Sequence, residues 1–139
     1  MKNLKAVMFA GFLMLAGSVI SVTAQDNMMM MDKMNPKNAT VAIIRADWCS
    51  ACKELEPVMS ELMKEYKGKL NFVHLDVTND ATTAKAAATA KSLGLTSFFE
   101  ANKKSTSTVG VFKNKKQLFK TTHKSDRAIF VSAFDKATN

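Results

Sequence analysis

An apolar run rich in β-branched residues, ATVAIIRADW at 39–48, leads directly into a segment with helical periodicity. The run predicts a buried strand. The segment after it repeats apolar residues at spacings of three and four, as an amphipathic helix requires: Leu55, Val58, Met59, Leu62 and Met63. Pro57 lies inside this helix and is expected to bend it, and Gly68 is expected to mark its end. A strand followed at once by such a helix favours folds in which helices cover a sheet.

Strand-like and helical segments continue to alternate after this first pair. LNFVHLDV at 70–77 is strand-like, and the alanine-rich segment that follows it is helical in propensity as far as Gly94. Asn79 is a candidate N-cap for that helix, and a short further helix is expected from Thr96. We therefore expect the first two strands to lie parallel, joined by a crossover helix.

The last third of the chain predicts a hairpin and a final helix. Two strand-like runs, 108–112 and 117–121, flank a polar turn of four residues, so they are expected to pair antiparallel. The final helix is expected from Asp126 to about Lys136, with these inward residues: Ala128, Ile129, Val131, Ala133 and Phe134. The order β-α-β-α-β-β-α predicts an α/β fold with a mixed four-stranded sheet flanked by helices.

The first 24 residues have the layout of a secretory signal. Lys2 and Lys5 precede an apolar run, and Val22-Thr23-Ala24 supplies the small residues of a cleavage site. The alternative is an uncleaved anchor, but the run falls short of the roughly 20 residues of a spanning helix and is diluted by Gly and Ser. We predict cleavage near Ala24, a periplasmic or secreted protein, a flexible methionine-rich lead-in at 25–38, and one folded domain at 39–139.

The distribution of positive charge along the chain argues against a nucleic-acid partner. The net charge is +8, near +6 without Lys2 and Lys5, and the lysines are scattered with few aromatic residues among them. Nucleic-acid binding is typical of a basic stripe that carries stacking side chains. We therefore expect a solvated basic surface, no nucleic-acid partner, and a monomer.

The element order, with WCSAC at the start of the first long helix, resembles the thioredoxin family over about 39–136. The resemblance also rests on three residues around the cysteines, and these are Trp48, Lys53 and Pro57. FKN at 112–114 resembles the hairpin turn of the family. Only about 14 residues separate the predicted cleavage point from residue 39, so the resemblance implies a minimal thioredoxin-like core without the first strand and helix of the family.

The resemblance implies a thiol–disulfide oxidoreductase with Cys49 as nucleophile and Cys52 as resolving thiol. A helix N-terminus favours a negative sulfur, which lowers the pKa of a cysteine there. Cys52, one turn deeper, is expected to be less exposed and to release the mixed disulfide. Trp48 is expected to shape the surface beside Cys49. The implied partners are protein thiols or disulfides and a membrane or extracytoplasmic redox partner, without a cofactor.

Two other readings of the cysteine pair remain open. A permanent bridge that closes so small a loop stabilises little. Zinc normally takes four ligands, or three and a water, and the chain has two cysteines and two histidines. Copper(I) accepts fewer and softer ligands, so Met28 to Met31 and Met34 leave a copper-binding or adaptor module as the alternative function. The predicted site residues therefore include no metal ligand.

Three positions depart from the family pattern. Ile43 occupies the place of a buried acid, and His74 in the next strand is the candidate replacement as a proton acceptor. Ser107 occupies the place of a cis-proline; a cis bond without proline costs about 2.5–4 kcal/mol, so we expect a trans bond. The loop of Ser107 and Thr108 is expected to receive the substrate backbone. Ser50-Ala51 replaces Gly-Pro, which leaves the direction of electron transfer open.

Overall fold

Strands and helices alternate in the order that the sequence predicts. The computed structural model describes residues 34–139, so the predicted signal peptide and the first part of the lead-in lie outside it. The elements are β1 (Ala39–Arg45), α2 (Ser50–Glu65), β2 (Leu70–Asp76), α3 (Asp80–Ser92), α4 (Thr96–Asn102), β3 (Thr108–Lys113), β4 (Lys116–Thr122) and α5 (Arg127–Thr138). Within the described range no helix is both long and apolar enough to cross a membrane.

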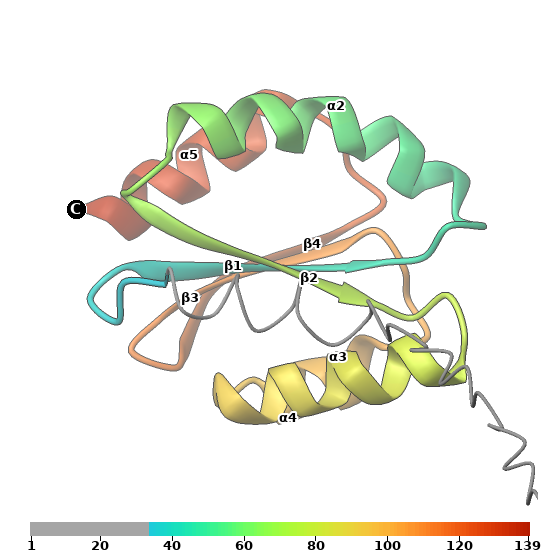
Figure 1. The fold of residues 1–139 in the computed structure, drawn as a ribbon. Coiled ribbons are helices and arrows are strands. Elements are labelled where there is room, and N and C mark those ends of the chain that lie inside the picture. Colours follow the sequence, from blue (N-terminus) through green and yellow to red (C-terminus); the bar gives the residue numbers. More distant parts are fainter. Residues whose placement is uncertain (1–33) are drawn as a thin grey trace, which may run out of the picture.

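The four strands form one mixed sheet in the order β2-β1-β3-β4. β1 and β2 are parallel, with Ile43 opposite His74, whereas β1 pairs antiparallel with β3 and β3 antiparallel with β4. The parallel pair and the antiparallel hairpin are both as predicted. Figure 1 shows α2 and α5 on one face of the sheet and α3 and α4 on the other.

The alternation of side chains along β1 divides the core into two layers. Val41 and Ile43 pack toward α2 and α5, whereas Ala42 and Ile44 pack toward α3 and α4. Successive residues of a strand point to opposite faces, so an uninterrupted apolar run can fill both layers. This explains why the central strand reads as a continuous hydrophobic segment.

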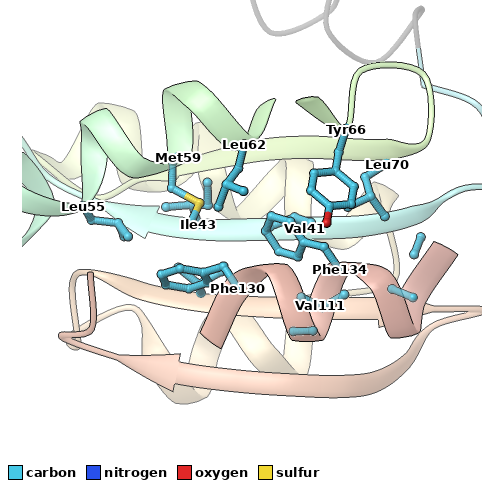
Figure 2. Close-up of a cluster of buried hydrophobic side chains, with 14 residues drawn as sticks. Val41, Ile43, Leu55, Met59, Leu62, Tyr66, Leu70, Val111, Phe130 and Phe134 are labelled. Carbon is cyan, nitrogen blue, oxygen red and sulfur yellow. The ribbon is translucent and has the colours of Figure 1, made fainter. Parts of the chain in front are cut away.

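The layer between the sheet, α2 and α5 is built on large side chains (Figure 2). Leu55, Met59 and Leu62 of α2 are buried, as their helical spacing predicts. The prediction for α5 is confirmed for Ala133 and Phe134 but was wrong for Ala128, which is exposed. Ile129 and Val131 are only half-buried. The buried positions are Phe130, Ala133, Phe134 and Ala137, which bring both phenylalanines onto the sheet.

The hairpin closes through a tight two-residue turn. Asn114 and Lys115 both have positive φ, 53° and 63°, as a type I′ turn requires. The strands on either side are each slightly longer than predicted and pair as far as Lys113 and Lys116. The turn therefore lies at the end of the sheet opposite the start of α2 (Figure 1).

Residues 34–38 are attached to the domain, although the sequence assigned them to the flexible lead-in. The Asn35 backbone and the Asn71 side chain exchange two hydrogen bonds of 3.0 and 2.8 Å. The Asn38 side chain donates to the Gly68 carbonyl over 2.8 Å. The folded domain therefore begins before residue 39.

Candidate active site

The two cysteines lie where β1 passes into α2. The chain turns after β1, with the Cys49 N–H donating to the Ala46 carbonyl over 3.1 Å. Cys49 is the N-cap of α2, and its sulfur accepts the Cys52 N–H over 3.1 Å. The first N–H groups of a helix have no partner within the helix, so this sulfur takes a role that Ser or Asp usually fills.

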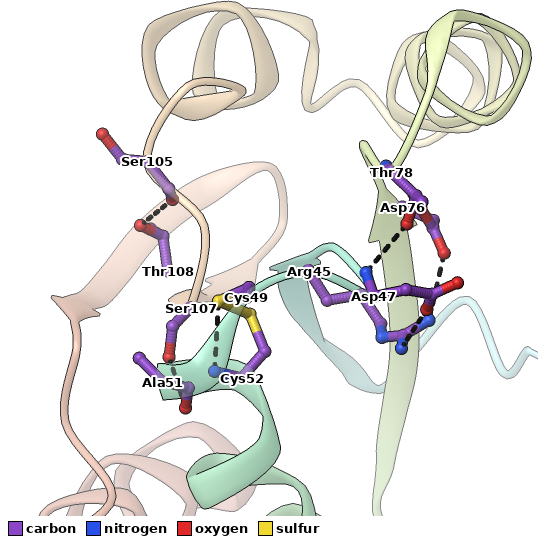
Figure 3. Close-up of a disulfide and its surroundings, with 10 residues drawn as sticks. All are labelled: Arg45, Asp47, Cys49, Ala51, Cys52, Asp76, Thr78, Ser105, Ser107 and Thr108. Atoms are coloured by element: carbon purple, nitrogen blue, oxygen red, sulfur yellow. Dashed lines mark hydrogen bonds and ion pairs between the residues drawn. A yellow bond between two sulfur atoms is a disulfide. The ribbon is translucent and has the colours of Figure 1, made fainter.

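Cys49 and Cys52 form a disulfide with their Cα atoms 5.3 Å apart. The two residues are buried to a similar degree, with 6% and 8% of their surface exposed, against a small apolar cluster that includes Ala46. The expectation that Cys52 is clearly less exposed is therefore wrong for the disulfide form, because the closed ring draws both sulfurs against the same cluster. The helix cap, not burial, distinguishes Cys49 (Figure 3).

Trp48 projects from the site surface and is anchored at one end. Its ring is 64% exposed, and its Nε1 donates to the Thr78 carbonyl over 3.1 Å. The Asp47 N–H donates to the Thr78 hydroxyl oxygen over 2.9 Å. These two bonds hold the segment before Cys49 to the chain that follows β2.

An ion-pair network beside this segment stabilises the ends of β1 and β2. Arg45 pairs with Asp76 at 3.0 Å and with Asp47 at 2.8 Å (Figure 3). Burial alone would raise the pKa of Asp76, but hydrogen bonds from Thr78 and the Arg45 charge outweigh it and lower that pKa. Asp76 therefore stays ionised and keeps Arg45 in place.

His74 and Cys52 line the same pocket, of about 400 Å³, beneath α2. His74 is opposite Ile43, which is buried at the position where the resemblance implied a missing acid. Burial, and next the Arg45 charge, lower the pKa of His74 below its ordinary 6.5. The imidazole is therefore neutral near pH 7 and able to accept a proton.

Lys53 and Pro57, the other two predicted supporting residues, are both exposed on α2. Lys53 follows Cys52 and begins the exposed face of the helix. Pro57 lies inside α2, where it has no N–H to donate.

Ser107 holds three parts of the site together. Its hydroxyl donates to the Ala51 carbonyl over 3.3 Å, its N–H to the Ile44 carbonyl over 2.8 Å, and its carbonyl accepts the His123 N–H over 3.0 Å. The described residues contain no cis peptide bond, and Ser107 has φ of +58°. The predicted trans bond is confirmed, and Figure 3 shows Ser107 beside the disulfide.

Thr108 faces the interior. It is fully buried, and its hydroxyl donates to the Ser105 carbonyl over 2.6 Å and lies 2.9 Å from the Thr122 hydroxyl. The backbone groups of Ser107 and the side chain of Thr108 are thus occupied within the fold. Both residues position the loop from inside.

Thr106 is the loop residue that the sequence analysis missed. Within the described residues its N–H and carbonyl make no hydrogen bond, and 8% of its surface is exposed. An unpaired N–H and C=O on one residue can add an extended peptide as a further strand. The signal was available, because Thr106 directly precedes the position that the resemblance assigned to proline.

The described residues contain no group of three or more His, Cys, Asp or Glu side chains placed to hold a metal ion. The copper alternative rests on Met28 to Met31, which lie outside the described residues, and on Met34, which is half-buried and packs against the core layer of α3 and α4. The described site consists of a disulfide-bonded cysteine pair and a neutral imidazole that lines the same pocket as Cys52.

The fold and the cysteine pair together define a thioredoxin-fold protein with a Cys-x-x-Cys site. The chain belongs to the thioredoxin family, whose model, described as Thioredoxin, matches residues 19–124. The matched range begins inside the predicted signal peptide and includes every predicted site residue.

Curated relatives and solved structures agree with this assignment. Thioredoxin C-2 of Corynebacterium nephridii is 34% identical over 67 residues, which are 48% of this chain and 62% of that protein. The thiol:disulfide interchange protein TxlA homolog of Synechocystis sp. is 31% identical over 78 residues, 55% of this chain and 43% of that protein. The chain thus spans less than two thirds of these relatives. Oxidised thioredoxin O2 of Arabidopsis thaliana shares the fold, with a TM-score of 0.54, 17% identity, and coverage of 81% and 86%.

Proposed function

We propose that the protein is an exported thiol–disulfide oxidoreductase that exchanges its Cys49–Cys52 pair with protein thiols and disulfides. The observation that carries the proposal is the position of the pair: Cys49 caps α2 with its sulfur, and Cys52 lies one turn later within disulfide reach. Relatives named thioredoxin and thiol:disulfide interchange protein support the same chemistry.

The cap explains why Cys49 is the attacking sulfur. Its thiolate would accept the Cys52 N–H and lie at the positive end of the α2 dipole. Cysteines in such positions have pKa values of roughly 3.5–7.5 instead of about 8.5, so a larger share is thiolate at neutral pH. Because the thiolate is the nucleophile, this position activates Cys49 and not Cys52.

The reaction proceeds through two exchanges. The Cys49 thiolate attacks a substrate disulfide, the substrate S–S bond breaks, and one substrate sulfur leaves as a thiolate. Cys52 then gives up its proton and attacks the Cys49 sulfur, which releases the second substrate thiolate and forms the Cys49–Cys52 disulfide. Two electrons pass to the substrate, and the protons from the two cysteines end on the substrate thiols. The reverse sequence oxidises a dithiol substrate.

Thr106 and Trp48 provide the substrate surface. The free N–H and carbonyl of Thr106 can pair with an extended substrate segment beside the cysteines. The exposed side chain of Trp48, which directly precedes Cys49 and is fixed by its bond to Thr78, offers an apolar contact. Backbone pairing does not depend on the substrate side chains, which suits an enzyme that acts on more than one protein.

His74 accepts the proton of Cys52 in this proposal. Both residues line one pocket, and the lowered pKa of His74 keeps its imidazole neutral at the pH where a base is needed. Ile43 cannot take this role, because its side chain does not ionise. The transfer can pass through water in the pocket, which has room for several molecules.

The signal-like first 24 residues support action outside the cytoplasm, with a membrane or extracytoplasmic redox partner that resets the cysteine pair. Outside the cytoplasm a Cys49–Cys52 disulfide can persist until that partner reduces or uses it. N-terminal sequencing of the protein recovered from its native host tests this part, and an intact residue 1 contradicts it.

Trapping of the mixed disulfide tests the chemistry. Cys52→Ser is expected to retain attack by Cys49 and to accumulate substrate proteins in dithiothreitol-sensitive adducts, whereas the matched Cys49→Ser variant is expected to trap few. The potential of the wild type, measured in glutathione buffers, is expected between about −270 and −120 mV, the range of catalytic dithiols. Absence of adducts with Cys52→Ser, together with tight binding of one Cu(I) by the reduced wild type, overturns the proposal in favour of the copper alternative.

A further inference from the structure

Positive charge is concentrated in one part of the chain. Residues 101–124, which run from the end of α4 through the β3–β4 hairpin, contain lysines and no acidic residue. The lysines of this segment are Lys103, Lys104, Lys113, Lys115, Lys116, Lys120 and Lys124. In α2, by contrast, acidic residues outnumber basic ones. The hairpin segment therefore carries much of the net charge of the domain.

Several of these lysines lie near one end or the other of the hairpin formed by β3 and β4. Lys104 is two residues before Thr106, and Lys124 directly follows His123, whose N–H donates to the Ser107 carbonyl. Lys113 and Lys116 are opposite each other in the strand register at the far end of the hairpin, beside the turn. At about 3.3 Å per residue, the five steps from residue 108 to residue 113 separate the two ends by about 17 Å.

Lys104 and Lys124 are the lysines at the active-site end that have no acidic partner. Both are exposed, and neither forms an ion pair within the described residues. Lys103 pairs with Glu100 at 2.6 Å, and Lys120 donates to the Asn102 side chain. The charges of Lys104 and Lys124 are therefore free to act on a bound partner.

The acidic groups around the cysteines are engaged elsewhere. Asp126 caps α5 by accepting the Ala128 N–H over 2.9 Å, and Asp47 pairs with Arg45. Lys53 and Glu54, both exposed near the start of α2, carry opposite charges and together add no net charge. A hydrogen bond leaves the negative charge of Asp126 in place, but Asp126 is the single acidic residue of segment 101–127, so Lys104 and Lys124 still give the Thr106 side of the disulfide a net positive charge.

We infer that the preferred substrates carry acidic residues next to the reactive disulfide. This inference rests on the proposed function and names the substrate class of the same site. Lys104 is two residues from Thr106, and Lys124 follows His123, whose N–H is bonded to Ser107. The residues that flank an extended substrate segment paired with Thr106 therefore come close to these two positive charges. Acidic flanks are attracted there and basic flanks are repelled.

Distance restricts the effect to this pair of lysines. The Debye length is about 8 Å at physiological ionic strength, so lysines at the turn, about 17 Å from the active-site end of the hairpin, are screened from a substrate bound at that end. Charge at Lys104 and Lys124 therefore selects substrates, whereas equal charge at Lys113 and Lys116 contributes little.

The test compares two charge reversals that change the net charge equally. Lys104→Glu with Lys124→Glu alters the active-site end, and Lys113→Glu with Lys116→Glu is the matched control at the turn. Each pre-reduced protein, which itself supplies the two electrons, is mixed with peptides that share one internal disulfide and carry Glu, Ser or Lys flanks. Fluorescence of Trp48, the single tryptophan, reports the rate constant of exchange.

We expect the active-site reversal to lower the rate constant for the Glu-flanked peptide about tenfold and to raise that for the Lys-flanked peptide, within the range of electrostatic steering. The control is expected to change either rate less than twofold. The differences should vanish in 1 M salt, where the Debye length is about 3 Å. The milder pair Lys104→Gln and Lys124→Gln should give about a threefold loss, which guards against misfolding of the reversed protein.

Two results overturn the inference. One is an equal effect of both reversals, which would mark a response to net charge alone, and the other is no effect of either. The Ser-flanked peptide separates this failure from that of the proposed function. If the wild type exchanges with the Ser-flanked peptide but shows no charge preference, only the substrate class is wrong. If the reduced protein reduces no peptide and the oxidised protein oxidises none of the corresponding dithiol peptides, the proposed function falls as well.

Discussion

The hydroxyl of Ser107 donates to the carbonyl of Ala51, the residue just before Cys52, over 3.3 Å. This bond links the loop before β3 to the first turn of α2, between two segments far apart in the sequence. The N–H and carbonyl of Ser107 are bonded as well, to Ile44 and His123. Ser107 therefore fixes the position of the loop relative to the disulfide and leaves the backbone N–H and carbonyl of the neighbouring Thr106 without a partner among the described residues.

Replacement of Ser107 by proline, the residue implied there by the family pattern, is expected to destabilise this protein. Proline requires φ near −65°, whereas Ser107 has +58°, and it removes the N–H that serves the buried Ile44 carbonyl. An unpaired buried carbonyl costs about 1–3 kcal/mol, so we expect a loss of at least about 2 kcal/mol in the free energy of unfolding. Denaturant titration of the oxidised protein measures it.

Ser107→Gly is the matched control. Glycine accepts the positive φ, which relieves about 1–2 kcal/mol, while loss of the hydroxyl bond costs about 0.5–1.5 kcal/mol. The variant should stay within about 1 kcal/mol of the wild type. A proline variant as stable as the glycine variant would show that the backbone of Ser107 does not set the loop.

His74 gives the stability of the protein a pH dependence near neutrality. Burial, and next Arg45, lower its pKa below 6.5 in the folded state, while Glu56 and Asp76 act in the opposite direction. Below pH 6.5 the unfolded chain then binds more protons than the folded one, so stability falls as the pH drops from 6.5 toward the lowered pKa. One proton gives at most about 1.4 kcal/mol per pH unit.

His74→Gln should remove this slope between pH 7.5 and 5.5, as measured by urea midpoints at each pH. The control is His123→Asn, in the exposed segment after β4, which should leave the His74 contribution intact. If the slope persists in His74→Gln, another group titrates in this range and the environment of His74 differs from that described.

The fold could be predicted because its signals are local. The apolar run of β1, the helical spacing in α2 and the polar hairpin turn each lie within one short segment. The residues of α5 that face the sheet were harder to predict, because Ile129 and Phe130 are both apolar and adjacent. Packing of Phe130 against Phe119 and Phe134 decides which of them turns inward, and those contacts exist only in the folded protein.

The site was predictable only in part, for the same reason. The cysteine pair and Trp48 are adjacent in sequence, so their motif is visible. The role of Ser107 depends on bonds to Ala51, Ile44 and His123, which no local pattern encodes. These bonds occupy Ser107 and so shift the open backbone position to Thr106.

Gly110 lies in the middle of β3, where no side chain fits. A Cβ atom there would lie 2.7 Å from the Phe112 ring and 2.8 Å from the Phe98 ring, and these rings pack edge to face with centroids 5.0 Å apart. Gly110→Ala must displace one ring, and overpacking of this kind costs about 1–3 kcal/mol. We expect a loss of about 2–3 kcal/mol and a changed near-ultraviolet circular dichroism signal.

Gly68→Ala is the control for Gly110, since a Cβ atom at Gly68 meets nothing within 4 Å. Its φ of +78° makes alanine unfavourable by about 1–2 kcal/mol through the backbone alone. That variant should leave the near-ultraviolet signal unchanged. An unaltered near-ultraviolet signal in Gly110→Ala would mean that the rings of Phe98 and Phe112 do not pack against the glycine.

The role proposed for His74 can be separated from its effect on stability by following the resolving step. In His74→Gln the Cys52 thiol loses its proton acceptor, so the mixed disulfide should accumulate at pH 6–7 and decay about tenfold more slowly than in the wild type, a modest effect for a general base. At alkaline pH hydroxide can take the proton in place of the imidazole, and the two proteins should converge. Acid quenching and mass spectrometry measure the amount of the mixed disulfide at each pH.

Glu56→Gln, at another ionisable position in the same pocket, is the control. If Glu56→Gln accumulates the adduct and His74→Gln does not, the carboxylate and not the imidazole takes the proton.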